Sequence, residues 1–347
     1  MNQQIIGWDV GGAHLKAALL SADGEILKVI QQPCALWKGI DQLSKALKLI
    51  MQEIGAGQYR HAITMTGELV DCFAGREQGV QAIIQTMRCL LPEQELWIFA
   101  GKAGLIAVEQ VTVQHTLDIA SANWLASATL VAGNCRNALF VDIGSTTTDI
   151  LLIENNALKV RGYTDYHRLV SGELLYTGVI RTAVMAIAQR AEFNGEDMGL
   201  MAEYFATMAD VYRLTGDLHA AHDQAETADG AGKTPADSAR RLSRLTGYEF
   251  SETDWPLWLA FAQYLKNRQK QMIHQACVQQ ILRANHPAEI SFIGAGVGRF
   301  LLKEIAAEQG IAYRDFSGLF KTANNLADID AADCAPAVAV GYLGLKV

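Results

Sequence analysis

Short apolar runs separated by turn residues open the chain. Residues 5–10 and 15–20 are apolar runs on either side of Gly11-Gly12, and EILKVIQ follows the turn SADG. Runs of this length, bounded by Gly, Asp and Ser, predict strands joined by tight turns. Apolar residues then recur at three- and four-residue steps, which predicts a helix over 40–54.

Strands and helices continue to alternate up to about residue 134. HAITMT and ELWIFA predict strands, and GVQAIIQTMRCLL predicts a helix between them. A further helix is predicted over 118–132, with Asp118 or Ser121 as its cap and Gly133-Asn134 as its end.

The opening pattern returns after residue 137. ALFVDI, the turn GSTT and TDILLI repeat the strand, turn and strand of the N-terminus. Placing one copy over the other matches Asp9 with Asp142, Gly11 with Gly144 and Leu19 with Leu152. An internal repeat reports how the whole chain is built. It predicts two domains that begin with the same β-hairpin and face each other across a cleft.

The pattern becomes mostly helical between about residues 170 and 285. Helices are predicted over 172–191, 196–214, 234–247 and 255–283. The segment 217–234 has no apolar periodicity and predicts an exposed loop or lid, whose role stays open.

The C-terminal part returns to alternating elements. EISFIGAG and AYRDF predict strands, and RFLLKEIAAEQG predicts a helix between them. The small residues of APAVAVGYLGL predict a helix packed tightly against another element.

Composition narrows the class of protein. The 347 residues are 50% hydrophobic and carry a net charge of −8, without the basic face that nucleic-acid binding needs. No apolar run approaches a membrane span, and the first residues lack the pattern of a signal peptide. The six cysteines are scattered without a CxxC pair, which favours free thiols in a reducing compartment. We expect a cytoplasmic enzyme with no nucleic-acid or membrane partner.

The two repeated turns, DVGGAHLK and DIGSTTTD, are candidate phosphate sites. Glycine lets a backbone approach a ligand closely, and successive N–H groups in a turn can hold an anion. Asp9 and Asp142 end their strands and are placed to hold Mg²⁺ through water, with phosphate oxygens as further ligands. Lys16 supplies a positive charge to the phosphate. Its counterpart in the second copy, Asp149, is a less secure site residue, and a structural role is the alternative. The predicted phosphate-binding residues are Gly11, Gly12, Ala13, Gly144, Ser145, Thr146 and Thr147.

Other motifs are weaker. In FIGAGVGRF, Gly294 and Gly296 follow a predicted strand, as in a substrate or nucleotide contact. GAGKT lacks the first glycine and the preceding strand of a P-loop, although Lys233 remains a candidate for a substrate phosphate or carboxylate. Arg181 in YTGVIRT is either a surface residue or a partner for a substrate carboxylate. HAAHD, which begins at His219, lacks a third ligand for zinc.

These motifs, in this order, resemble the actin, sugar kinase and Hsp70 superfamily. DVGGAHLK and DIGSTTTD correspond to its two phosphate motifs, FIGAGVGRF to its adenosine motif, and GELVDCF and AVAVGYLG to its connecting motifs. The resemblance implies an α/β protein with two ribonuclease-H-like, actin-like ATPase domains around a central cleft. The first would span 1–133 and 335–347, and the second 134–334, with a helical insertion at about 170–285.

A narrower resemblance comes from GWDVGGAHLK, ASANWLASA, YTGVIRT and TADGAGKTPADSARRLSRLTG. Together they resemble a hydantoinase/oxoprolinase-like family of tetrahydromethanopterin-linked C1 metabolism. Its archaeal members are similar to a synthase of methanofuran biosynthesis, and its bacterial members would serve methylofuran. The resemblance implies a transferase that joins a furanylmethyl diphosphate to the phenol of γ-glutamyltyramine and releases diphosphate.

The residues leave the phosphate-bearing molecule open. Asp118 and His14 are candidates for the base that accepts the phenol proton. A helix cap is the favoured alternative for Asp118, and a hydrogen bond within the turn is the alternative for His14. An ATP-dependent small-molecule kinase or ATPase, and a non-catalytic nucleotide-binding switch, are the alternatives. We expect a small phosphorylated substrate and Mg²⁺ in every case, ATP in the alternatives, and a possible homo-oligomer.

Overall fold

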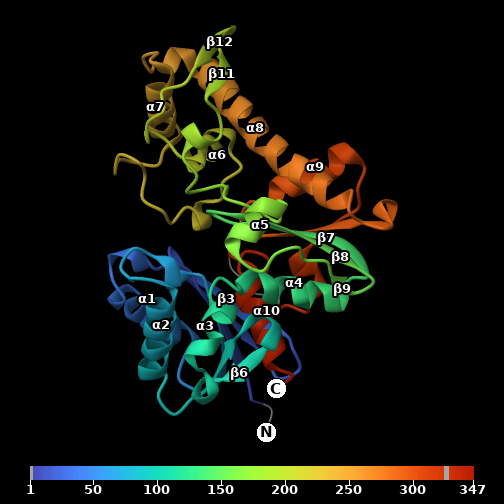
Figure 1. The fold of residues 1–347 in the computed structure, drawn as a ribbon. Helices are drawn as coiled ribbons and strands as arrows, with labels where there is room; N and C mark the ends of the chain where they lie inside the picture. The colour runs from blue at the N-terminus through green and yellow to red at the C-terminus, as the bar shows by residue number, and fades with distance from the viewer. Residues whose placement is uncertain (1–2, 324–327) are drawn as a thin grey trace. The chain divides into compact units, whose positions relative to one another are not determined.

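The computed structural model describes residues 3–323 and 328–347 and divides into two compact units. Figure 1 shows the elements of each unit. The first unit comprises Met1–Asn137, Ile153–Lys159 and Asp315–Val347, and the second comprises Ala138–Leu152 and Val160–Arg314. The expected division at 133 and 334 therefore differs from this one mainly at 315–334, which belongs to the first unit.

The first unit is built on a mixed sheet with the strand order β3-β2-β1-β4-β5-β6. The first three strands form the predicted antiparallel meander, β4 lies parallel to β1, and β5 lies parallel to β4. Its strands are β1 Ile5–Val10, β2 His14–Leu20, β3 Ile26–Pro33, β4 Arg60–Met65, β5 Glu95–Phe99 and β6 Leu105–Ala107.

Alternating side chains of β1 enter the two sides of this sheet. Ile6, Trp8 and Val10 are fully buried in one apolar cluster with residues of α1 and α2. Gly7, between them, faces α10, where a Cβ would lie 1.9 Å from the Ala337 carbonyl oxygen. The predicted tight packing of the C-terminal small-residue helix is thus confirmed. The α-helices of this unit are α1 Asp41–Ile54, α2 Arg76–Leu90, α3 Thr116–Ile119, α4 Asn123–Asn134 and α10 Ala335–Gly344.

The helix predicted over 118–132 is wrong at its N-terminal end. The chain forms α3, breaks, and starts α4 only at Asn123, because Ser121 has a φ of 53° that no helix accommodates. Asp118 lies in the first turn of α3 and caps neither helix. Ser121 instead donates a hydrogen bond from Oγ to Glu68 Oε1 at 2.8 Å.

The second unit repeats the arrangement around the strand order β10-β8-β7-β13-β14, with β9 also paired to β8. Here β13 lies parallel to β7, as β4 lies parallel to β1 in the first unit. The strands of this sheet are β7 Asn137–Ile143, β8 Thr148–Glu154, β10 Leu174–Leu175, β13 Ser291–Ala295 and β14 Tyr313–Asp315, and β11 Arg190–Phe193 and β12 Glu196–Gly199 form a separate hairpin. The short β9, Ala157–Leu158, pairs with β8 but belongs to the segment 153–159 of the first unit.

The insertion at about 170–285 is only partly helical. The helix predicted over 172–191 is wrong, since this segment contains β10, an extended loop and a single 3₁₀ turn at Val184–Ala186. Of the helix predicted over 196–214, only the C-terminal part forms, as α6. The other two helices are confirmed. The helices of this unit are α5 Asp165–Ser171, α6 Met208–Thr215, α7 Pro235–Thr246, α8 Trp255–Ile281 and α9 Arg299–Gln309.

Candidate functional site: two equivalent turns

The first turn, between β1 and β2, is closed by one backbone hydrogen bond. Gly11 N donates to His14 O at 3.0 Å, and the strand register places Asp9 opposite Lys16. The carbonyls of Gly12 and Ala13 accept from the amides of Leu36 and Cys34 beyond the end of β3. His14 is buried at the start of β2, and its carbonyl oxygen accepts the hydrogen bond that closes the turn. A role for its ring as a base stays a prediction.

The second turn, between β7 and β8, has the same closure at the equivalent positions. Gly144 N donates to Thr147 O at 2.9 Å. In both turns the residues from the glycine onward, 11–13 and 144–147, are partly exposed. The repeat predicted from sequence therefore extends to the hydrogen bond that shapes each turn.

The neighbouring parallel strand reinforces each turn in the same way. In the first unit Thr66 N, after β4, donates to Val10 O at 3.0 Å, and in the second Gly298 N, after β13, donates to Ile143 O at 2.8 Å. Val10 and Ile143 precede the two equivalent turn glycines. Each turn thus stands at the carboxyl end of two parallel strands, which is where open α/β sheets bind ligands.

Polar side chains surround Asp9 within the first unit. Asn123 Nδ2 lies 3.4 Å from Asp9 Oδ1, and Lys16 Nζ donates to the Asp333 carbonyl oxygen at 2.8 Å. Lys16 is thereby held beside Cys334, where burial raises the pKa of the thiol and the Lys16 charge opposes that rise. Asn123, in ASANW, and Asp333 were not predicted as site residues.

A buried carboxyl group also stands near the first turn. Glu68 follows β4 in the motif GELVDCF, is fully buried and accepts from Ser121. Ser121 and Asn123 are two residues apart, so one loop reaches both Glu68 and Asp9. Asp118 is exposed on α3, and its role as a base stays a prediction.

The second turn rests on the segment that was predicted to be a helix. A Cβ on Gly178 would lie 2.4 Å from Thr146 N, so the backbones are in direct contact. Val179 N donates to Gly144 O at 3.1 Å, and Arg181 N donates to Ser145 O at 2.8 Å. Arg181 is exposed at the end of this contact, not on a helix surface. The glycine of YTGVIRT was the available signal for this close approach.

The glycines of FIGAGVGRF have packing roles of their own. Gly296 has a φ of 79°, and a Cβ there would lie 2.4 Å from Asp142 Oδ1 and 2.3 Å from Ile143 O. At Gly294 a Cβ would lie 2.6 Å from the Tyr313 hydroxyl oxygen. Both glycines are buried. The structure explains both without a ligand, and ligand contacts by Gly294 and Gly296 stay predictions.

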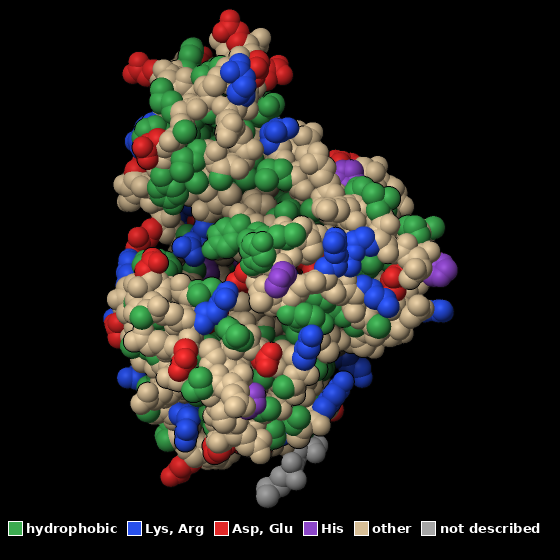
Figure 2. All heavy atoms as spheres, viewed as in Figure 1, with side chains coloured by type: hydrophobic (Ala, Val, Ile, Leu, Met, Phe, Trp, Pro, Cys, Tyr) green, Lys and Arg blue, Asp and Glu red, His purple; other side chains and the backbone are tan. Residues whose placement is uncertain are grey.

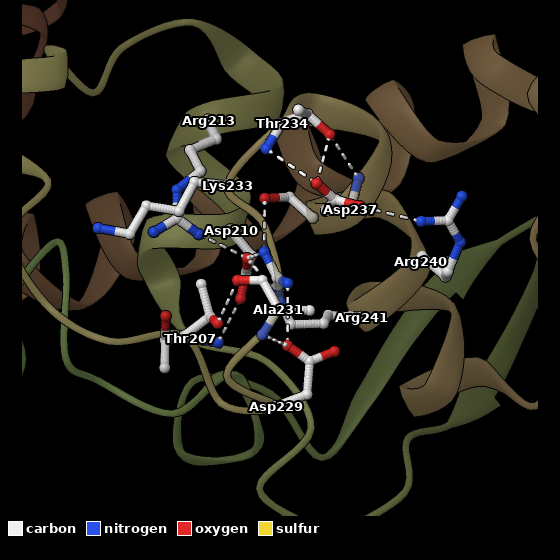
Figure 3. Close-up of polar contacts among 12 residues, drawn as sticks. Thr207, Asp210, Arg213, Asp229, Ala231, Lys233, Thr234, Asp237, Arg240 and Arg241 are labelled. Carbon is white, nitrogen blue, oxygen red and sulfur yellow. Dashed lines mark hydrogen bonds and ion pairs between the residues drawn. The ribbon is translucent and has the colours of Figure 1, made fainter.

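Lys233 belongs to a network of ion pairs around α6 and α7 (Figure 3). Its Nζ lies 3.2 Å from Asp223 Oδ1, which also pairs with Arg213. Burial raises the pKa of Asp223, but Arg213 and Lys233 together hold it below the usual value. The ion pairs join the loop 217–234 to α6 and α7. Lys233 therefore already has a structural partner, and a contact with a ligand stays a prediction.

Asp149 also has a structural partner. Arg168, which is 2% exposed, donates from Nη2 to Asp149 Oδ1 at 2.5 Å and to the Glu173 carbonyl oxygen at 3.2 Å. The structural alternative for Asp149 is therefore the one observed.

The donor set of each turn fits a hard cation. Asp9 and Asp142 present carboxylate oxygens at equivalent positions, Asn123 lies beside Asp9, and hydroxyls of Ser145 and Thr146 lie in the second turn. Mg²⁺ prefers one or two carboxylates combined with water and phosphate oxygens. No group of three or more His, Cys, Asp or Glu side chains that could hold a metal occurs in the described residues, His219 and His222 included.

A comparison with protein families decides the relationship. The family model of hydantoinase/oxoprolinase proteins matches residues 60–318. The chain belongs to the hydantoinase/oxoprolinase family.

Two curated relatives are similar to this chain, one of them over most of its length. A (4-{4-[2-(gamma-L-glutamylamino)ethyl]phenoxymethyl}furan-2-yl)methanamine synthase of Methanocaldococcus jannaschii is 29% identical over 312 residues, 90% of this chain and 91% of the relative. The synthase of the same name from Methanococcus vannielii is 32% identical over 112 residues, which cover 32% of this chain and 48% of that protein. These similarities support an enzymatic function related to that of the synthases.

Among solved structures, nucleotide-free acetone carboxylase superposes with a TM-score of 0.58 at 10% identity, over 98% of this chain and 70% of that one. At this identity the similarity concerns the fold alone. The chain has the two-domain, actin-like α/β fold that the resemblance of its motifs implies, whereas the central cleft stays a prediction.

On the side shown in Figure 2, Lys and Arg side chains are interspersed with Asp and Glu. None of the helices in residues 3–323 and 328–347 is long and apolar enough to cross a membrane.

Proposed function

We propose that this family member is a transferase that forms the furan–tyramine ether of methanofuran-type cofactors and releases diphosphate. The equivalent hydrogen-bonded turns, each preceded by an acid at a strand end, carry this proposal. The similarity to the Methanocaldococcus jannaschii synthase over 90% of the chain supports the choice of substrate.

The turns suit a diphosphate leaving group. As the bond between the furanylmethyl carbon and the ester oxygen breaks, its electron pair leaves with diphosphate and negative charge grows on the phosphate oxygens. N–H groups and the Lys16 Nζ can stabilise this charge. They do so most strongly when they are already held in position and do not have to move as the charge develops. Hydrogen bonds to the carbonyls of Gly12, Ala13, Gly144 and Ser145 already fix the backbone of both turns.

The metal supplies Lewis-acid stabilisation of the departing phosphate when it is bound. Asp9 and Asp142 are the residues that would hold it. Asn123, at 3.4 Å from Asp9 Oδ1, orients that carboxylate.

The acceptor reacts through its phenol oxygen. That oxygen forms the new C–O bond to the furanylmethyl carbon, and its proton passes to a base, for which His14 and Asp118 remain the candidates. Arg181, exposed beside the second turn, suits the γ-glutamyl carboxylate, since a guanidinium matches a carboxylate in charge and shape.

A single assay separates this function from an ATP-dependent kinase. The purified protein is incubated with Mg²⁺, γ-glutamyltyramine and 5-(aminomethyl)furan-2-ylmethyl diphosphate, and ether and diphosphate are quantified. We expect one diphosphate for each ether, without ATP. ATP consumption with phosphorylation of an acceptor, and no ether, would instead establish the kinase. Tight nucleotide binding with no turnover of either substrate would establish the switch.

A further inference from the structure

The segment 176–181 carries an aromatic side chain and a cationic one at its two ends. Tyr176 is 72% exposed and Arg181 is exposed, whereas residues 177–180 between them are buried. The buried middle is the part whose backbone contacts the second turn. The placement of both end residues is therefore tied to that turn.

The backbone at Tyr176 is anchored on both sides. Before it, Leu175 pairs with Thr148 in the sheet, and after it Thr177 O accepts from Thr148 Oγ1 at 2.7 Å. Gln269, fully buried on α8, donates from Nε2 to Thr177 Oγ1 at 2.8 Å and to Gly178 O at 2.9 Å. Tyr212 in turn donates to Gln269 Oε1. An exposed ring on so well-fixed a backbone loses little further entropy when a ligand covers it.

Tyr176 also lies within reach of a group attached to a phosphate at the turn. Gly178 touches Thr146 N, and two residues of chain span at most about 7 Å. In an arylmethyl diphosphate a single methylene separates the ring from the phosphate ester oxygen. The ring of such a substrate is therefore held close to the turn that binds its phosphates.

We infer that Tyr176 forms the subsite for the aromatic ring of the phosphate-bearing substrate, which its own ring covers by stacking. The inference rests on the proposed function for the identity of that substrate. Stacking suits an electron-rich ring, and the face of a tyrosine also attracts the positive charge that develops on the ring and its methylene as diphosphate leaves.

The exposed aromatic surface of α5 provides a matched control. Tyr166 is 71% exposed and lies with Leu169 and Val170 on the outer face of α5, where hydrophobic side chains gather in Figure 2. It has the same side chain and exposure as Tyr176 but belongs to a different element. Tyr166→Ala therefore tests the general effect of removing an exposed ring.

Binding of two non-reactive analogues tests the subsite. In both, a methylene replaces the ester oxygen next to a bisphosphonate; one carries a furan ring and the other a tetrahydrofuran ring of similar shape. Affinities are measured by calorimetry with Mg²⁺ for the wild type, Tyr176→Phe, Tyr176→Leu, Tyr176→Ala and Tyr166→Ala, and thermal melting confirms folding of each variant.

We expect the wild type to prefer the furan analogue by roughly tenfold, the scale of one aromatic stacking contact. Tyr176→Phe and Tyr166→Ala should retain the preference, whereas Tyr176→Leu and Tyr176→Ala should lose it. A wild-type preference in folded Tyr176→Leu or Tyr176→Ala, or an equal loss in Tyr166→Ala, would overturn the inference. If the preference depends on Tyr176 but the protein forms no ether, the subsite stands and the proposed function fails. If ether forms but the preference for the furan analogue does not depend on Tyr176, the proposed function stands and the subsite fails.

Discussion

The two hairpin turns share a backbone and differ in their side chains. Gly11 and Gly144 donate the same hydrogen bond, and Asp9 and Asp142 stand at the same distance before them. Seven residues after each acid the charges are opposite, with Lys16 on β2 and Asp149 on β8. The repeat therefore gives the two proposed anion sites the same backbone shape, whereas only the first has a lysine at this position.

The turns also differ in what holds them. The carbonyls of the first accept from residues just beyond β3, a neighbour in sequence. The carbonyls of the second turn accept from the amides of 179–181, and Gln269 on α8 donates a hydrogen bond to the carbonyl of the adjacent Gly178. We infer that the first turn is set by local chain geometry and the second by the insertion.

The largest expected effect tests the equivalence of the two acids. Asp9→Asn and Asp142→Asn should each lower Mg²⁺-dependent kcat/KM by roughly 10³, about 4 kcal/mol, because each removes a carboxylate charge from the proposed metal. Steady-state kinetics at varied Mg²⁺ measure the loss. Asp23→Asn, in the next turn of the same hairpin, is the control and should have little effect. A wild-type rate in either acid variant would break the equivalence.

Glycine substitutions separate packing from ligand approach in the second unit. Gly296→Ala should destabilise this unit by about 3 kcal/mol, because its φ is 79° and the Cβ would lie 2.3 Å from Ile143 O. At Gly144 the nearest contact is an ordinary 3.4 Å, so Gly144→Ala should cost less than about 1 kcal/mol while weakening phosphate binding. Denaturant unfolding and diphosphate titration provide the two readouts. Equal stability losses would contradict this distinction.

Acid sensitivity should distinguish the first unit. Burial lowers the pKa of His61 to about 4, while Trp8 donates to its Nδ1 at 2.9 Å. The unfolded chain binds a proton at this histidine below about pH 6.5, so the stability it contributes is complete above that pH and falls toward pH 4, by up to about 3 kcal/mol. His61→Gln should flatten this slope in the unfolding free energy of the first unit. The exposed His286→Gln should leave it unchanged, and an unaltered slope in His61→Gln would exclude His61 as its source.

The charge reversal at positions 16 and 149 predicts opposite outcomes. Asp149→Asn removes the ion-pair partner of buried Arg168 and should destabilise the second unit by about 2 kcal/mol, with diphosphate affinity little changed. Lys16→Met should weaken diphosphate binding about tenfold with a smaller loss of stability. Thermal melting and calorimetry on both variants test this. A loss of affinity in Asp149→Asn equal to that in Lys16→Met would place both residues at the ligand.

The parts predicted well from sequence are those governed by local patterns. The helix expected over 40–54 is observed as Asp41–Ile54, and the repeat correctly anticipated two turns of equal shape. The helix beginning after Thr234 was also predictable, because Thr234 and Asp237 form a capping box ahead of an apolar stripe.

The parts missed depend on contacts distant in sequence. In 172–191 the buried Val179, Ile180 and Val184 have helix-like spacing, but amides of this segment bond to carbonyls of the second turn. The spacing of apolar residues indicates which side chains are buried, but it does not indicate which groups the backbone amides bond to. The same applies to two buried or partly buried amides. Asn123 contacts Asp9, which is 114 residues away, and Gln269 bonds to Gly178, which is 91 residues away.

The central claim is that each of the two equivalent turns contributes to phosphate binding. Calorimetric titration with inorganic diphosphate and Mg²⁺ tests it on the wild type and on Gly12→Val and Gly144→Val, which place a branched side chain in one turn each. The account predicts one diphosphate per chain in the wild type and at least tenfold weaker binding in both variants, with folding retained. Wild-type affinity in either folded variant would contradict it.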